Sequence, residues 1–342
     1  MSLGEVCTSL KIKGECVLNK GLSSLEQQVQ KVFKHTRAGS YATRDKYKGN
    51  AMRAAKWISQ EFKLQSLKNL QDKHVAAYAK YLQAQDLKPK TIKDSLSAIR
   101  YMHDNAPRAK HSISDNKTLQ QEYKFSIPKV HTIKGDRGWT KEEYSKMIGI
   151  TREVESSKSN PNNARSARDY RDVAVMARTM GMRVAEATLA TRSQAEEAIR
   201  TGMYNIGSEA KNGRPRSVPL SPEGRQVLEE RIANTSRGDK LFVHRNEKSH
   251  HAIDRIEQFN SNHRDKVVTS EGIGQRTWTD RHQGKVYTNN LTLHGLRYNY
   301  IQERVLQEMD KGFYREQAAQ IVTKEVGHNR ADVIYIYLGG KI

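Results

Sequence analysis

Cysteine, hydrophobic residues and long apolar runs are all scarce in this sequence, and each shortage excludes a class of protein. The two cysteines, Cys7 and Cys16, cannot build a disulfide framework or a four-cysteine zinc site, which indicates incidental thiols in a reducing compartment. No stretch approaches the roughly 20 apolar residues that a membrane helix needs. Residues 1–20, which we take as a leader, also lack the apolar run of a signal peptide. The composition therefore predicts a soluble, intracellular protein with no membrane partner.

Positive charge is what the sequence has in excess. Its 59 lysine and arginine residues outnumber 38 aspartate and glutamate residues, which gives a formal net charge of +21. A charge of that size attracts polyanions and supplies the non-specific part of nucleic-acid affinity. The acidic residues are dispersed along the chain, which indicates a charged globular protein and not a basic tail. RNA binding is favoured by charge alone, because the sequence has no recognisable aromatic stacking motif.

The length of 342 residues favours two domains, because single hydrophobic cores stop growing near roughly 250–300 residues. Hydrophobic residues make up 36% of the chain, which is enough for two modest, mostly helical cores. We expect a helical domain at 21–126, a linker at 127–138 and a second domain at 139–342. Pro128 and Gly135 mark the linker, because proline and glycine interrupt regular secondary structure.

Apolar residues recur at helical spacing through most of the first domain, from Leu22 to about His103. Four amphipathic helices are expected there, and Pro89 suits the start of the fourth. Their apolar stripes lie within residues 25–33, 51–62, 75–82 and 92–102.

Helices are also expected in the second domain. Thr140 and Glu143 form a capping box that opens one helix. Residues 170–180 predict another, which stops at Gly181. The segment 260–290 is polar with little periodicity, and we expect it to be a long loop.

A β-hairpin is the strongest strand signal in the sequence. Asn212-Gly213 predicts a tight turn between the strand-like residues 204–206 and 217–219. Pro219 places the second strand at a sheet edge, because proline cannot donate a ladder hydrogen bond. The predicted fold is therefore mainly α with a small antiparallel β-sheet.

Two cations near these elements are candidate phosphate ligands. Arg183 begins a short helix, and a guanidinium beside helix N–H groups is a good anion site. A surface salt bridge is the alternative for this arginine. Lys211 comes just before the hairpin turn, from which a long cation can reach into a groove. Its alternative is a solvated turn lysine.

Four more candidates lie near the C-terminal end of the sequence. His294 and Arg297 are three apart on one helical face, so they could hold one phosphate together, unless the histidine is structural. His328 follows Gly327 at a helix boundary, where it could also be an ordinary cap. Tyr337, nine residues later, offers an oxygen nucleophile, although tyrosines in such an apolar helical run are usually core.

The order of these residues resembles the tyrosine recombinase (integrase) family of site-specific DNA recombinases. Gly-Met-Arg183-Val-Ala-Glu is similar to the family's first arginine motif, and Ala-Lys211-Asn-Gly-Arg-Pro-Arg-Ser-Val-Pro-Leu is similar to its β-hairpin. His294-Gly-Leu-Arg297 matches the His-x-x-Arg box. Gly327-His328 and Tyr337 match the closing box. The resemblance spans essentially the whole chain and identifies 21–126 as the family's core-type DNA-binding domain and 139–342 as its catalytic domain.

The resemblance implies cleavage and rejoining of DNA without metal, cofactor or ATP. The Tyr337 oxygen attacks a backbone phosphate, forms a 3′-phosphotyrosyl link and releases a 5′-hydroxyl, and a partner strand's hydroxyl reverses the step. Arg183 and Arg297 would clamp the phosphate oxygens, and Lys211 would protonate the leaving oxygen. His294 is the candidate base.

Other residues take supporting roles in this hypothesis. His328 would donate a hydrogen bond to a phosphate oxygen, and Glu186 would hold the site together. Tyr335 is a rival nucleophile, but two residues on a helix point about 200° apart, so only one of Tyr335 and Tyr337 can face the phosphate. The family spacing selects Tyr337, and Tyr335 would then pack in the core.

The family also implies the partners. These are double-stranded DNA with inverted-repeat core sites, a homotetramer on two duplexes, and a possible directionality or DNA-bending accessory protein in a nucleoid-associated, cytoplasmic setting. Two features depart from compact relatives: an insertion at Asp310-Lys311-Gly312 and a short tail after Tyr337. A type IB topoisomerase-like enzyme that relaxes DNA and a non-catalytic architectural DNA-binding protein are the alternative functions.

Overall fold

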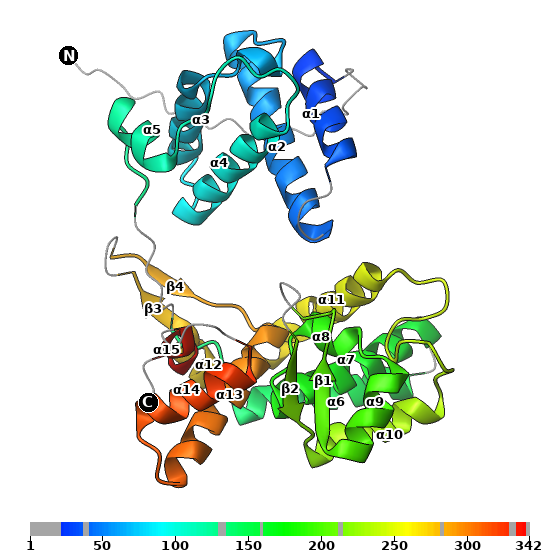
Figure 1. The fold of residues 1–342 in the computed structure, drawn as a ribbon. Coiled ribbons are helices and arrows are strands. Elements are labelled where there is room, and N and C mark those ends of the chain that lie inside the picture. The colour runs from blue at the N-terminus through cyan, green and yellow to red at the C-terminus, as the bar shows by residue number, and fades with distance from the viewer. Residues whose placement is uncertain are drawn as a thin grey trace, which may run out of the picture. The chain divides into compact units, whose positions relative to one another are not determined.

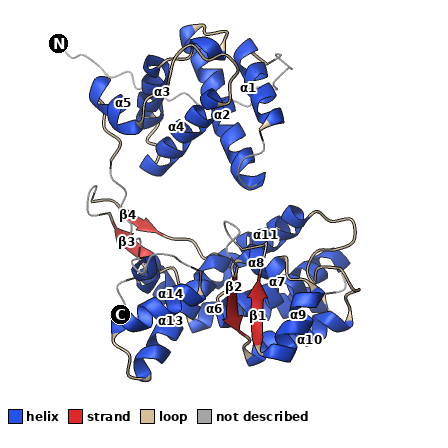
Figure 2. Ribbon diagram, in the orientation of Figure 1, coloured by secondary structure: helices blue, strands red, loops and turns tan. Residues whose placement is uncertain are grey.

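The computed structural model describes residues 22–36, 41–128, 135–157, 160–210, 215–280, 284–327 and 333–339. The chain divides into two compact units, Met1–Val130 and His131–Ile342, and this boundary falls inside the segment 127–138 expected as a linker. The leader, with Cys7 and Cys16, lies outside the described residues. Helices dominate both units, as Figures 1 and 2 show, and none of the described helices is long and apolar enough to cross a membrane.

Unit 1 contains the four expected helices. Ser23 caps the first through a capping box with Glu26, and Pro89 occupies the first turn of the fourth. A further helix, α5, and a short 3-10 turn were not predicted, because their apolar residues are too few to set a period. The elements are α1 (Ser24–His35), α2 (Tyr41–Phe62), η1 (Leu67–Asn69), α3 (Asp72–Ala84), α4 (Pro89–Asp104) and α5 (Asn116–Glu122).

The core of unit 1 forms where the apolar stripes of these helices meet. Leu25 and Val29 of α1, Ile58 of α2, and Leu96 and Ile99 of α4 are all buried in one cluster. The 3.6-residue period places such residues on one face of each helix, so burying that face closes a small bundle.

Unit 2 is organised around the helix α7. Three of its alanines and both methionines, with Tyr170 and Val173, are buried because α6, α10, α11 and α13 pack around it. The helices are α6 (Lys141–Ser156), α7 (Pro161–Met180), α8 (Val184–Thr188), α9 (Arg192–Thr201), α10 (Pro222–Ala233), α11 (Ser249–Val267), α12 (Ser270–Arg276), α13 (Leu293–Asp310), α14 (Arg315–Glu325) and α15 (Ile334–Leu338).

Two antiparallel two-stranded sheets occur among the described residues of unit 2. The expected hairpin pairs β1 (Met203–Ile206) with β2 (Arg216–Pro219), with Tyr204 opposite Val218. The turn Asn212-Gly213 itself lies outside the described residues. The second sheet pairs β3 (Thr277–Thr279) with β4 (Val286–Thr288), and the sequence did not predict it.

The prediction of a long loop at 260–290 is wrong. This segment contains the second half of α11, all of α12 and the β3–β4 sheet. The α11 helix buries only a few well-spaced residues, among them Ile256, Phe259 and Val267, while most of its surface is polar. Its tertiary contacts with α7 stabilise a helix whose own apolar pattern is too sparse to predict it.

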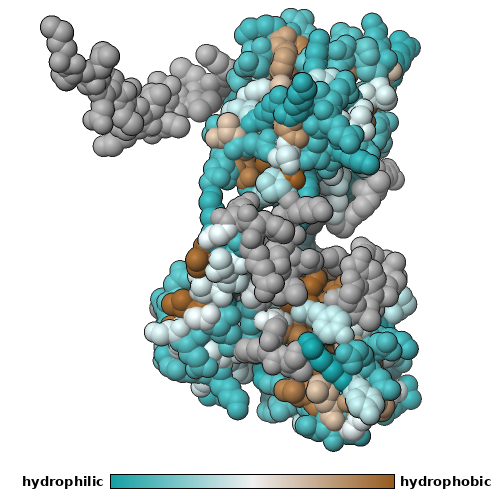
Figure 3. Space-filling view, turned by 90° about the vertical axis from the view of Figure 1, so that its left-hand side faces the viewer, coloured by the Kyte–Doolittle hydropathy of each residue, from teal (hydrophilic) through white to brown (hydrophobic). Residues whose placement is uncertain are grey.

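The helix α13 links two separate cores of unit 2. Its first turn contributes Leu293 and Leu296 to the cluster around α7, whereas Ile301 and Val305 pack with α14 and α15 in another cluster. The C-terminal helix α15 is therefore held mainly by α13 and α14. In the view of Figure 3 the surface is largely hydrophilic and its hydrophobic patches are small.

Candidate active site

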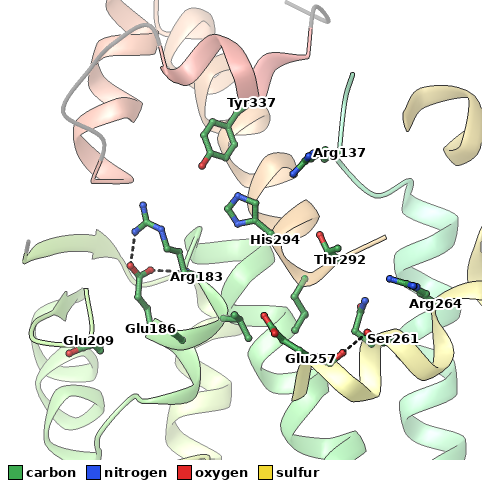
Figure 4. A pocket seen from close by; sticks show the side chains of 14 residues that line it. Arg137, Arg183, Glu186, Glu209, Glu257, Ser261, Arg264, Thr292, His294 and Tyr337 are labelled. Carbon is green, nitrogen blue, oxygen red and sulfur yellow. Dashed lines mark hydrogen bonds and ion pairs between the residues drawn. The ribbon is translucent and has the colours of Figure 1, made fainter. Parts of the chain in front are cut away.

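A cavity of about 720 Å³ in unit 2 brings together several of the predicted residues. Arg183 enters it from the start of α8, His294 from the first turn of α13 and Tyr337 from α15, as Figure 4 shows. The remaining lining includes Arg137, Glu186, Glu209, Glu257, Asn260, Ser261, Arg264 and Thr292.

Arg183 is anchored by Glu186, which lies three residues later in the short helix α8. The backbone N–H of Arg183 and one guanidinium nitrogen each donate to the Glu186 carboxylate, both over 2.7 Å. The backbone N–H of this N-cap residue is thus already used by the Glu186 carboxylate. The Arg183 side chain remains 18% exposed toward the cavity, so its guanidinium is both anchored and accessible.

Glu186 also holds a second arginine. Arg216, from β2, donates from two guanidinium nitrogens to the two Glu186 oxygens, each over 2.7 Å. Burial alone would raise the pKa of Glu186, but the hydrogen bonds and charge of Arg216 and the charge of Arg183 outweigh it and lower the pKa to about 2. Glu186 is therefore a permanent carboxylate, which fits the supporting role expected for it.

Arg297 does not reach the cavity surface. It is fully buried, and its guanidinium donates to the backbone carbonyls of Gly181 and Val326. His294, in contrast, is exposed and lines the cavity. The two side chains therefore do not both reach the cavity surface in this structure, and their joint contact with a phosphate stays a prediction.

Arg297 nevertheless belongs electrostatically to the site. Burial, followed by the positive charges of Arg183 and Arg216, lowers the pKa of Arg297 to about 10, while Tyr337 and Glu186 act in the opposite direction. Among the residues that the structure describes, two guanidinium groups, those of Arg183 and Arg216, are bonded to the one carboxylate of Glu186, and the charge of Arg297 lies near them (the Glu186 network). The excess positive charge of this network favours an anion beside Arg183, while Glu209 and Glu257 line other parts of the cavity.

Tyr337 is held by aromatic contacts with α13. Its ring lies 4.5 Å from that of Tyr298 and 5.9 Å from that of His294, measured between centroids. Burial raises the pKa of Tyr298 to about 12, so Tyr298 stays neutral and packs beside Tyr337 without competing as a phenolate. The Tyr337 side chain is only 7% exposed, and its hydroxyl points into the cavity in Figure 4.

Tyr335 does not line this cavity. Its ring is half-buried, packs against the cluster formed by α13, α14 and α15, and lies 5.3 Å from the Arg315 guanidinium. The two tyrosines of α15 thus point in different directions, as their helical spacing requires.

Two predicted site residues cannot be located. Lys211 and His328 both lie outside the described residues. The residue before His328, Gly327, has a φ of +70° and approaches Arg216 so closely that an added Cβ would lie 2.8 Å from its Cδ. The Gly-His motif therefore begins against the Glu186 network.

Sequence reasoning missed Arg137, Arg216 and Arg264 as members or neighbours of the site. A signal existed for Arg216, because it shares one face of β2 with buried Val218, and a charge on an inward face needs a partner. Arg137 and Arg264 line the cavity from the segment before α6 and from α11, and no motif marks either. Among the described residues, no three His, Cys, Asp or Glu side chains are grouped to hold a metal ion.

Residues 22–112 match a family model described as phage integrase, N-terminal. The solved structure of the Tn1549 transposon integrase in complex with transposon right end DNA is similar at a TM-score of 0.54 and 12% identity, covering 92% of this chain and 94% of that chain. The XerH site-specific recombinase bound to palindromic difH substrate is similar at a TM-score of 0.55 and 17% identity, covering 93% and 82%. No curated protein matches the chain in sequence.

At these identities the solved structures establish the fold, which is the tyrosine recombinase fold, with a helical N-terminal unit and a mainly helical second unit. The family model covers the N-terminal unit independently. Together, these findings show a chain with the fold of these recombinases and an N-terminal unit of the phage-integrase type.

Proposed function

We propose that this chain is a site-specific DNA recombinase of the integrase type, which cuts and rejoins DNA through a 3′-phosphotyrosyl intermediate. The observation that carries the proposal is the cavity that the Tyr337 hydroxyl shares with Arg183 and His294, beside the excess positive charge of the Glu186 network. A phosphodiester is an anion that such a cavity attracts, and a tyrosine oxygen can attack its phosphorus.

In the proposed reaction, the Tyr337 oxygen bonds to phosphorus as the bond to the 5′-oxygen breaks. His294 takes the phenolic proton, and Lys211 gives a proton to the leaving 5′-oxygen. Arg183, accessible and fixed by Glu186, neutralises charge on the non-bridging oxygens. His328 donates to one of those oxygens. The 5′-hydroxyl of another strand then reverses the same steps.

Arg297 contributes differently from the cavity-lining residues in this proposal. With its guanidinium buried against two carbonyls, it raises the local positive potential from behind the cavity. Direct contact with a phosphate requires the Arg297 hydrogen bonds to the Gly181 and Val326 carbonyls to be exchanged for bonds to phosphate oxygens.

We further propose that the substrate is double-stranded DNA with inverted-repeat core sites, held by a homotetramer on two duplexes, because strand exchange needs paired active sites. A directionality or DNA-bending protein could assist. Arg137 and Arg264, which also line the cavity, are suited to phosphates next to the scissile one. We propose that this recombinase acts at the nucleoid.

The nucleophile is tested with a nicked duplex suicide substrate built from inverted repeats that flank the gene. Tyr337→Phe should bind this DNA with unchanged affinity yet form no covalent protein–DNA adduct on a denaturing gel, because only the attacking oxygen is removed. Tyr335→Phe is the matched control and should form the adduct at the wild-type rate.

An undiminished adduct in Tyr337→Phe would exclude this residue as the nucleophile. Recombination between two cognate sites, measured beside relaxation of a supercoiled plasmid without them, separates the proposed activity from that of a type IB topoisomerase.

A further inference from the structure

The segment that enters unit 2 runs along one side of α13. The backbone N–H of Trp139 donates to the Asn299 amide oxygen over 2.8 Å, and the Asn299 amide nitrogen donates back to the Trp139 carbonyl over 3.0 Å. At Gly295 the Arg137 carbonyl comes so close that an added Cβ would lie 2.4 Å from it. Residues 136–139 (the entry segment) are thus bound closely to the helix that carries His294.

The same segment contacts the end of the helix that carries Tyr337. The Gln302 amide nitrogen donates to Asp136 Oδ1 and to the backbone carbonyl of Tyr337, both over 2.9 Å. Gly339, with a φ of +57°, approaches the Asp136 backbone so closely that an added Cβ would lie 2.9 Å from Asp136 Cα. One buried amide therefore joins the entry segment to α15.

Gln302 continues a stripe of residues along α13. His294, Tyr298 and Gln302 are spaced by four, so they lie on one face of the helix. The first lines the cavity, the second packs its ring against that of Tyr337, and the third binds the Tyr337 carbonyl. The ring and the backbone of Tyr337 are thus both held by this face.

We propose that Gln302 is a positioning residue for the nucleophile, which ties the backbone of Tyr337 to Asp136 and so couples the entry segment to the placement of the reacting oxygen. The inference rests on the proposed function of Tyr337. Glutamine suits the task because its amide nitrogen carries two N–H donors, one for each acceptor. Both Gln302 and Asp136 are buried, so water does not readily replace either bond.

The coupling has a direct consequence for the reaction. Asp136 follows the boundary between the units by only a few residues, and neighbouring Arg137 lines the cavity. A displacement of the entry segment therefore moves the anchor of α15 and a cavity cation together. Small displacements matter because attack on phosphorus needs close alignment of the reacting atoms.

The test uses the full-length chain and Gln302→Met, which keeps the side-chain length but removes both donors. Adduct formation on the nicked suicide substrate should slow roughly tenfold to a hundredfold, with the Kd for DNA within about twofold of wild type. Hydrogen exchange of residues 334–338 should become faster. Asp136→Ala should change both measurements in the same direction. Gln320→Met, the same change at an exposed position of α14, is the control and should change neither.

Each outcome decides the inference. Wild-type adduct rates and unchanged exchange in Gln302→Met overturn it, and so does a loss of DNA affinity as large as the loss of rate, which indicates general unfolding. If wild-type protein forms no adduct, the proposed function fails, while the exchange of α15 still decides whether Gln302 holds the helix.

Discussion

The Glu186 network and a second buried network in unit 2 are built from the same kinds of side chain, but their charges balance differently. In the second network (the Asp169 network), fully buried Asp169 accepts from Arg231 over 2.6 Å, Arg255 over 2.8 Å and His244 over 2.9 Å. Two more carboxylates extend it: Asp172 bonds to Arg231 and Glu247 bonds to Arg255.

The difference lies in the ratio of charges. Among the described residues, the Asp169 network extends through Arg171, Arg168 and Glu155, so that four arginines pair with four carboxylates. In the Glu186 network, two arginines pair with one carboxylate and the charge of Arg297 lies near them. A buried charge without a partner is costly, so a balanced network is explained by the fold alone. The unbalanced network lies beside a cavity, and an anionic substrate would supply the missing charge.

The largest expected effect is on the rate of adduct formation, which should depend on the Glu186 network and not on the Asp169 network. Arg183→Ala should slow adduct formation on the suicide substrate by roughly 10²–10³-fold, because it removes a cation placed on the transition-state charge. Arg255→Ala should instead lower the free energy of unfolding by about 3 kcal/mol, since it breaks a buried pair, while folded protein forms the adduct normally. Single-turnover adduct assays and urea titrations measure the two effects. Equal losses of adduct rate in both variants would contradict the distinction.

The second prediction concerns acid stability. Because the pKa of Glu186 is lowered from 4.5 to about 2, its charge stabilises the fold above pH 4.5, and this contribution is lost as the pH falls through 2. The shift corresponds to about 3 kcal/mol of unfolding free energy. Glu186→Gln should therefore flatten the loss of stability between pH 4.5 and 2, as measured by urea unfolding at each pH.

Asp172 provides the contrasting control in the Asp169 network. Burial raises its pKa despite the nearby Arg231, so this carboxyl binds a proton more readily when the protein is folded and opposes acid unfolding. Asp172→Asn should not flatten the loss of stability between pH 4.5 and 2. If the loss of stability at low pH is flattened in this variant, or is unchanged in Glu186→Gln, then the predicted link between pH and stability has the wrong sign or the wrong residue.

The smallest expected effect is on salt dependence. Arg137→Ala should weaken DNA binding only modestly, and the slope of log K against log salt should fall by about 1, because one phosphate contact is lost. Arg165→Ala, an exposed arginine beside the Asp169 network, is the matched control and should leave the slope unchanged. Fluorescence anisotropy across a salt series measures both. Equal slopes for Arg137→Ala and wild type would remove Arg137 from the DNA interface.

Much of the fold could be predicted from local patterns. The four helices of unit 1 follow from apolar spacing, and the capping box at Thr140 and Glu143 is present with both reciprocal hydrogen bonds. Helix α11 could not be predicted, because its buried residues are sparse and its helicity depends on packing against α7.

The candidate site also has a part that the sequence predicts and a part that it does not. Motif spacing selects Tyr337 over Tyr335, and the structure places the first in the cavity and the second on Arg315. The spacing places His294 and Arg297 on roughly the same side of α13, but it does not say how deep each side chain lies. The structure buries Arg297 and exposes His294. The catalytic roles of these residues, and of Lys211 and His328, remain predictions.

By itself the sequence determined the local elements, the positive charge and the order of the reactive side chains, because each depends on neighbouring residues or on composition. The tertiary structure alone decided which charges meet. Arg216 reaches Glu186 from 30 positions away, and Gln302 joins Asp136 across 166 positions. Contacts over such separations form only when the packed fold brings distant segments together, so no local pattern encodes them.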